Sequence, residues 1–202
     1  MLHLKEGALL LIEFQNEWLS KNGKLNNLLS DTEQLSISLD NAKNIIQSAR
    51  KTKMNIIHSG LSFTKQYKEL GKAEYGLRAV IPKRQTFLEN TNARQFIAPF
   101  EPKENEFVVQ GRMGSSAFSA SNLDIYLRNN RIHTLFIMGF ALHVCVESTL
   151  RAAHDLGYES IVIDDASVAF NQEQKDYFLK NTIHHFGSSM KSNDFINLLT
   201  KG

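Results

Sequence analysis

The sequence has few of the residues that mark several classes of protein. Among its 202 residues there are one cysteine, three prolines and one tryptophan. A single cysteine excludes a disulfide bond within the chain and fits a reducing compartment, so we expect a cytoplasmic protein. No apolar run approaches the roughly 20 residues needed to cross a bilayer, and residues 1–6 lack the pattern of a secretory signal. We therefore expect no membrane partner.

The charge of the chain is close to balanced. There are 23 Lys and Arg against 21 Asp and Glu, a formal net charge of +2. The basic residues are spread along the whole chain, so we expect no nucleic-acid partner. Apolar and charged contents of 42% and 22% are typical of globular proteins. With no evident linker or repeat, residues 1–202 are predicted to form a single domain.

Short apolar runs alternate with amphipathic segments along the chain. The predicted strands are residues 8–14, 54–58, 107–110, 134–139 and 160–163, and the predicted helices are residues 32–52, 123–129, 144–156 and 172–184. Residues 59–104 are punctuated by glycine and proline, and we expect loops, short helices and part of a substrate pocket there. Alternating strands and helices predict an α/β protein, a three-layer α/β/α doubly wound fold with a mostly parallel sheet.

Reactive side chains follow three of the predicted strands, at the carboxyl edge where such sheets bind ligands. Glu13 interrupts the first apolar strand, where a carboxylate is costly unless it is paired or used, and Arg112 in the loop after the third strand is a natural partner. Cys145 is expected to open the helix after the fourth strand. The unpaired N–H groups there would lower the thiol pKa from about 8.5 into a range of about 3.5–7.5. The alternative is a buried structural cysteine.

Two histidines lie near the same edge of the predicted sheet. His58 ends the second strand and His143 precedes Cys145. Either could act as a base or a metal ligand, or simply line the pocket or pack in the core. Neither has a second ligand at a spacing typical of a metal site, so we predict no metal site.

Three segments carry a resemblance to a known family. They are ALLLIEFQNEW at residues 8–18, GRMGSSAF at 111–118 and GFALHVCVESTLRAA at 139–153. In this order they resemble the opening strand, the lysine loop and the nucleophile segment of the isochorismatase-like cysteine hydrolases. The nucleophile segment is the most specific of the three. The resemblance covers nearly the whole chain and implies the isochorismatase-like hydrolase fold.

The resemblance also implies a mechanism and a site. Family members use an Asp–Lys–Cys triad to hydrolyse C–N bonds of small amide, ureide or carbamoyl compounds through a thioester. Here Cys145 would be the nucleophile, with Glu13 and Arg112 at the other two positions. A cis peptide between Phe140 and Ala141 is implied, with an oxyanion hole formed by the N–H groups of Ala141 and Cys145. Isochorismatases proper need no cysteine, so the amidohydrolase branch is favoured.

Glu13 and Arg112 depart from the usual aspartate and lysine, and the sequence leaves their effect open. Arginine can grip a carboxylate with two hydrogen bonds and turn it away from the thiol. Alternatively, the extra methylene of glutamate restores its reach to Cys145. The second functional hypothesis is therefore a catalytically impaired member that binds a small molecule or a protein. A third is thiol redox sensing, although the chain has no resolving cysteine.

The remaining expectations concern ligands and partners. The predicted pocket side chains are Gln15, Trp18, His58, Phe63, Tyr75 and Phe118. The nicotinamidase branch has an Asp-x-His metal motif after the second strand, where this chain has His58-Ser59-Gly60. We therefore predict no zinc, no other cofactor and no nicotinamidase activity. The expected partners are a small-molecule substrate and further copies of the chain in a homo-oligomer, a dimer or larger.

Overall fold

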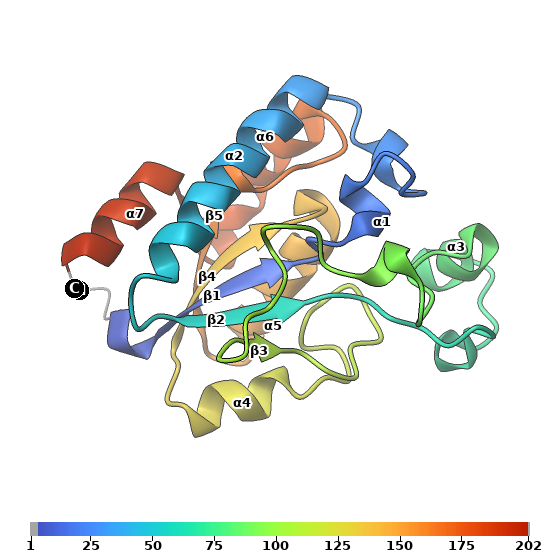
Figure 1. Cartoon of the computed structure of the whole chain (residues 1–202), viewed down its shortest axis with the longest axis horizontal. Coiled ribbons are helices and arrows are strands. Elements are labelled where there is room, and N and C mark those ends of the chain that lie inside the picture. The colour runs from blue at the N-terminus through green and yellow to red at the C-terminus, as the bar shows by residue number, and fades with distance from the viewer. Residues whose placement is uncertain (1–3, 202) are drawn as a thin grey trace.

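Six strands form one parallel sheet at the centre of the molecule (Figure 1), in a computed structural model that describes residues 4–201. Their order across the sheet is β3-β2-β1-β4-β5-β6. The strands are β1 Gly7–Ile12, β2 Asn55–Ser59, β3 Phe107–Val108, β4 Thr134–Gly139, β5 Glu159–Ile163 and β6 Ser188–Met190. Every pair of neighbouring strands is parallel.

Helices cover both faces of this sheet. They are α1 Asn16–Leu19, α2 Thr32–Ala49, α3 Leu77–Arg84, α4 Leu123–Asn129, α5 Glu147–Asp155, α6 Gln172–Asn181 and α7 Ser192–Lys201. Apolar residues of α2 and α7 belong to one buried cluster, and those of α4, α5 and α6 belong to the other. The predicted three-layer α/β/α fold is confirmed. None of the helices in residues 4–201 is long and apolar enough to cross a membrane.

The central strand β1 shows why an unbroken apolar run is needed here. All six of its residues are buried. Leu9 and Leu11 point into the cluster of α2 and α7, whereas Leu10 and Ile12 point into the opposite cluster. A parallel strand covered on both faces has no polar side, so its sequence does not alternate.

Most predicted elements are present, and the differences lie mainly at their ends. Helix α4 and strand β4 have the predicted bounds, and Asp31 caps α2 by accepting a hydrogen bond from the N–H of Gln34. The predicted helix 144–156 is divided into a π-helical turn, Leu142–Val146, and α5. Helices α1 and α7 and strand β6 were not predicted. The buried side chains of Phe195 and Leu199 dock α7 on the cluster that contains α2.

The order of the strands places a crevice between the ends of β1 and β4. The chain leaves β1 towards β2 and leaves β4 towards β5, so the two connections diverge and open a ligand site at this point. In the register of the sheet, Ile12 lies opposite both Ser59 of β2 and Gly139 of β4. The residues that follow these three positions therefore come together at one edge.

Gly139 allows the close approach of β4 to β1 at this edge. A Cβ atom at this position would lie 2.1 Å from the carbonyl oxygen of Ile12. The φ angle of Gly139 is +142°. We predict that Gly139→Ala lowers the free energy of unfolding by at least about 2 kcal/mol, because the backbone of β1 must move to relieve the overlap. Urea unfolding followed by circular dichroism measures the change.

Gly157→Ala is the matched control for this substitution. Gly157 also has a positive φ of +88°, but an added Cβ would meet no atom within 4 Å. The control therefore carries the backbone cost without the overlap. A Gly139→Ala protein no less stable than the Gly157→Ala protein would contradict the close contact between β1 and β4.

Candidate active site

Glu13 is the first residue beyond β1 and is fully buried. Its φ of +57° lies in the left-handed region, and its N–H donates to the carbonyl oxygen of Ser59 at 2.8 Å. The chain therefore turns sharply where β1 ends, with its backbone tied to the end of β2. Non-glycine residues rarely adopt this conformation. Where they do, the site is often one in which the placement of the side chain matters for function.

Arg112 pairs with Glu13 in the interior. Its Nη2 donates to Oε1 of Glu13 at 2.6 Å, and both side chains are only 1% exposed. The guanidinium also donates to the carbonyl oxygens of Gly114 at 3.0 Å and Ser115 at 2.6 Å. The indole Nε1 of Trp18 donates to the other oxygen of Glu13, Oε2, at 2.8 Å. Both oxygens of the carboxylate thus have a hydrogen-bond donor.

Cys145 lies on the π-helical turn between β4 and α5, and its side chain is buried. Burial raises the pKa of the Cys145 thiol well above its usual value; the negative charge of Glu13 raises it further, whereas Arg112 lowers it. The expectation of a thiol pKa lowered by a helix N-terminus is therefore wrong. The structure favours a neutral thiol beside a carboxylate.

The backbone before Cys145 has two notable features. The peptide bond between Phe140 and Ala141 is cis, as the resemblance implied. In the part of the chain that the structure describes, no oxygen accepts a hydrogen bond from the N–H of Ala141. Ala141 and Cys145 line the same cavity.

Cys145 and Glu13 share a cavity of about 290 Å³. Its walls are mostly apolar and come from α1 and the segment after it, the loop after β2, α3 and the residues after it, the π-helical turn and the loop before α6. The other lining residues are Trp18, Leu25, Leu28, Leu61, Leu77, Val80, Ile81, Arg84, Thr86, Phe87, Ala141, Val144 and Phe170. Trp18 was predicted from the sequence. Seven of the others lie in residues 59–104, where part of the pocket was expected, but sequence reasoning named none of these seven side chains, because that segment shows no clear periodicity.

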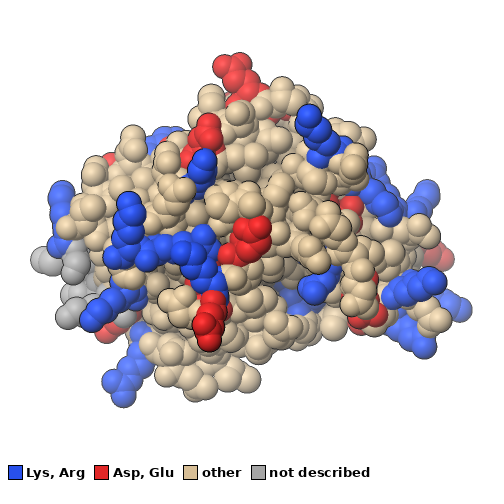
Figure 2. Space-filling model, in the orientation of Figure 1, with Lys and Arg blue, Asp and Glu red and all other residues tan. Residues whose placement is uncertain are grey.

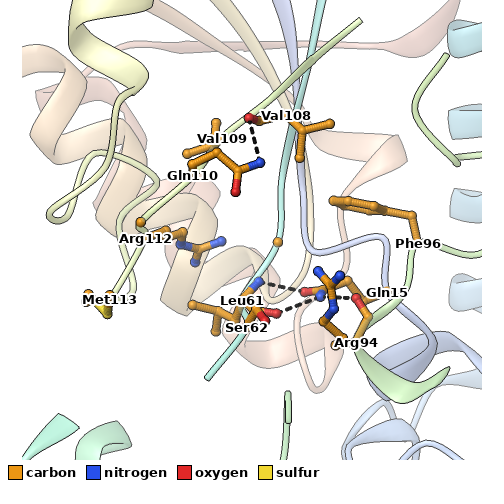
Figure 3. A pocket seen from close by; sticks show the side chains of 12 residues that line it. Gln15, Leu61, Ser62, Arg94, Phe96, Val108, Val109, Gln110, Arg112 and Met113 are labelled. Atoms are coloured by element: carbon orange, nitrogen blue, oxygen red, sulfur yellow. Dashed lines mark hydrogen bonds between the residues drawn. The ribbon is translucent and has the colours of Figure 1, made fainter. Parts of the chain in front are cut away.

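Three of the predicted pocket residues lie outside this cavity. Gln15 lines a smaller pocket of about 90 Å³, which Arg112 also borders (Figure 3). The side-chain amide of Gln15 forms hydrogen bonds with the backbone of Leu61 and Arg94, so it holds loops together. Phe63 is only 1% exposed and packs in the core, whereas Tyr75 is 85% exposed. Aromatic or polar character alone did not indicate where these side chains point.

His58 and Phe118 also lie elsewhere. His58 is fully buried, and its Nε2 forms a hydrogen bond of 2.7 Å with Glu106. Burial lowers the pKa of His58, although the Glu106 carboxylate raises it. Phe118 stacks on Tyr158 with ring centroids 5.6 Å apart. Within residues 4–201, no three His, Cys, Asp or Glu side chains gather as a metal site would require.

Comparison with known proteins assigns the family. A family model described as the Isochorismatase domain matches residues 7–194. The chain belongs to the isochorismatase family. The isochorismatase family protein YwoC of Bacillus subtilis is 31% identical over 102 residues, which are 50% of this chain and 53% of that protein. The chain thus spans about half the length of this relative.

Two further relatives of this isochorismatase-family chain match more of its length. The ureidoacrylate amidohydrolase RutB of Serratia proteamaculans is 29% identical over 174 residues, covering 81% of this chain and 70% of that protein. The crystal structure of a cysteine hydrolase from Pseudomonas syringae pv. phaseolicola aligns with a TM-score of 0.85. The two sequences are 18% identical, and the alignment covers 99% of this chain and 95% of the Pseudomonas chain. At this identity the likeness shows a shared fold.

The first prediction concerns thiol reactivity. We expect the rate of Cys145 alkylation by iodoacetamide to be still rising with pH beyond the ordinary thiol pKa of about 8.5, because burial and Glu13 disfavour the thiolate. Glu13→Gln removes the nearby negative charge, so its pH–rate profile should move to lower pH. Mass spectrometry of the alkylated protein over a pH series measures both profiles.

Glu147→Gln is the control for this measurement. Glu147 begins α5 two residues from Cys145, but its carboxylate pairs with Arg151 and is not among the charges that shift the thiol pKa. Its profile should match the unmodified protein. If the Glu13→Gln profile also overlays that of the unmodified protein, the carboxylate does not act on the thiol.

The second prediction concerns the buried ion pair. Arg112→Met leaves the Glu13 carboxylate buried without its cation, and we expect the free energy of unfolding to fall by about 3–5 kcal/mol. Adding Glu13→Gln removes the unpaired charge, so the double variant should be more stable than Arg112→Met alone. Urea unfolding of both single variants and the double variant measures this coupling, and additive losses would contradict it.

Proposed function

We propose that this protein is a cysteine amidohydrolase that cleaves a C–N bond of an amide, ureide or carbamoyl compound through a thioester. The observation that carries the proposal is the shared cavity of Cys145 and Glu13, with Arg112 paired to the carboxylate. The name of the RutB relative, a ureidoacrylate amidohydrolase, supports the same bond type. In this proposal Cys145 is the nucleophile, Glu13 is the base and the cavity holds the substrate.

The first half of the proposed reaction forms the thioester. The Cys145 thiol gives its proton to Glu13 as the sulfur bonds to the carbonyl carbon of the substrate. The carbonyl oxygen gains negative charge and can accept from the free N–H of Ala141, with the N–H of Cys145 as a second proposed donor. When the C–N bond breaks, Glu13 returns the proton to the nitrogen, which leaves as ammonia or an amine.

The second half releases the acid. Water bonds to the thioester carbon and gives a proton to Glu13, and the C–S bond breaks. Glu13 then returns that proton to the sulfur, so thiol and carboxylate regain their starting forms. The net reaction consumes one water and yields a carboxylic acid and ammonia or an amine. Since a raised thiol pKa leaves few thiolates at rest, proton transfer to Glu13 is the step that activates Cys145.

The hydrogen bonds of Glu13 are compatible with this role. Oε1 accepts one hydrogen bond from Arg112, and Oε2 accepts one from Trp18. Each carboxylate oxygen can accept in two directions, so a proton from the thiol still has a place to go. The glutamate is also longer than the family's aspartate by one methylene, which favours reach to the sulfur over withdrawal from it.

Ammonia release tests the proposal. A panel of primary amides, ureides and carbamoyl compounds is incubated with the protein, and ammonia is measured by a coupled assay. We expect Cys145→Ala to abolish release, and Glu13→Gln to lower kcat by about 100-fold or more because the general base is lost. Cys145→Ala should retain the unfolding midpoint of the unmodified protein. Turnover that survives in Cys145→Ala would reject the mechanism.

A second candidate is a binding protein on the same fold, in which the site no longer turns over. The contacts of Arg112 and Trp18 to both oxygens of Glu13 favour it, because they fix the carboxylate in place. Arg112→Lys separates the two candidates. Since lysine is the usual residue of the family, a gain of activity in this variant would indicate that the natural site is impaired.

A further inference from the structure

The walls of the Cys145 cavity are almost entirely apolar. Apart from the reacting residues, the lining side chains are apolar with two exceptions, Thr86 and Arg84. Three of the lining residues, Trp18, Phe87 and Phe170, are aromatic. A small polar ureide would leave these walls without partners, whereas an apolar group of matching size would displace water from them. The volume of about 290 Å³ is near the lower end of the range for small-molecule sites, roughly 300–1,000 Å³.

Helix α3 forms the wall of the cavity that faces solvent. Leu77 and Val80 line the cavity and yet are 40% and 42% exposed. Arg84 is in the last turn of the same helix and is also exposed. It is the one basic side chain among the cavity residues. Arg84 therefore lies where a ligand would extend from the buried thiol towards water.

Arg84 has no competing partner within the described chain. Among residues 4–201, no carboxylate forms an ion pair with it, and its guanidinium donates no hydrogen bond. By contrast, the buried cation of the site, Arg112, is occupied by Glu13. The charge of Arg84 is thus available to a ligand.

The surroundings of Arg84 reinforce its charge. Residues 65–84 contain six Lys and Arg but two Glu, although the whole chain has a net charge of only +2. Figure 2 shows basic side chains gathered at the end of the molecule where Figure 1 places α3. The near-even spread of charge along the sequence thus has a local exception beside the cavity. Such a concentration attracts anions to the opening.

We propose that the substrate is an amphiphilic amide, with an apolar body and a carboxylate at the end remote from the scissile bond, and that Arg84 selects this carboxylate. The inference rests on the proposed function at Cys145 and specifies its substrate class. The amide carbonyl lies at Cys145, the apolar body lies along the walls, and the carboxylate meets the guanidinium of Arg84 at the solvent side. Arginine suits this role because its planar fork matches a carboxylate.

A matched series of compounds tests this assignment. The monoamides of straight-chain dicarboxylic acids carry an amide at one end and a carboxylate at the other. The primary amides of monocarboxylic acids with the same number of methylenes carry a methyl group in place of the carboxylate. In both series we expect kcat/KM to rise about threefold to fourfold for each added methylene until the cavity is filled. At the best length, the dicarboxylic monoamide should be preferred by about 5-fold to 30-fold over its neutral partner.

Variants of the two arginines of α3 identify the source of that preference. Arg84→Gln should bring the ratio of kcat/KM values between charged and neutral partners close to one. Arg84→Lys should keep part of the preference, because it retains the charge without the fork. Arg78→Gln is the matched control. Arg78 is on the same helix but lines a neighbouring hollow, so the ratio should stay unchanged.

Binding to Cys145→Ala separates this inference from the proposed function. Isothermal titration of the same compounds with this variant measures the preference without turnover. If the protein hydrolyses no amide but binds the charged compounds more tightly in a way that depends on Arg84, the proposed reaction alone is overturned. Turnover with no carboxylate preference would overturn the inference alone, as would an equal effect of Arg78→Gln. If none of the compounds binds or reacts, the substrate class is wrong.

Discussion

The buried ion pair between Glu13 and Arg112 is the interaction on which the site depends. It joins the end of β1 to the loop after β3, across the end of β2 that lies between them. Neither charge is tolerable alone in the interior, so each residue enforces the position of the other. The carbonyl oxygens of Gly114 and Ser115 hold the guanidinium from the far side. The carboxylate is therefore fixed beside Cys145 before any substrate arrives.

This fixed carboxylate also affects the protonation of the Cys145 thiol. A thiol that is buried beside a negative charge keeps its proton, and the positive charge of Arg112 only partly offsets that tendency. A resting thiol is less reactive towards oxidants and other electrophiles than a thiolate. The proposed base, Glu13, thus adds to the rise in the Cys145 thiol pKa that burial causes. In the proposed reaction, activation by Glu13 therefore occurs only when a carbonyl group is present for the sulfur to attack.

The sequence predicted the layout of the site better than its walls. Strand ends in a parallel sheet meet at one edge, so the positions of Glu13, Arg112 and Cys145 followed from topology and from the family resemblance. The cavity walls come from α3 and from loops whose sequences have no period that fixes which side chains face inward. Gln15 and Phe63 illustrate the limit. Residue type suggested a pocket position for both. The side chain of Gln15 instead hydrogen-bonds to the backbone, and the side chain of Phe63 packs in the core. The direction of the thiol pKa shift was also wrong, because burial and the negative charge of Glu13 raise the pKa.

The two departures from the usual triad are best understood together. An arginine in place of lysine is longer and needs several acceptors around its planar head, and this structure supplies them from Glu13, Gly114 and Ser115. A glutamate in place of aspartate extends the carboxylate by one methylene, so it can meet the guanidinium and still border the cavity that contains the sulfur. Changing only one of the two alters the length of one partner and leaves the other unchanged. Positions 13 and 112 thus carry charges of the same sign as the usual triad, and the two larger side chains fit one another as a buried ion pair.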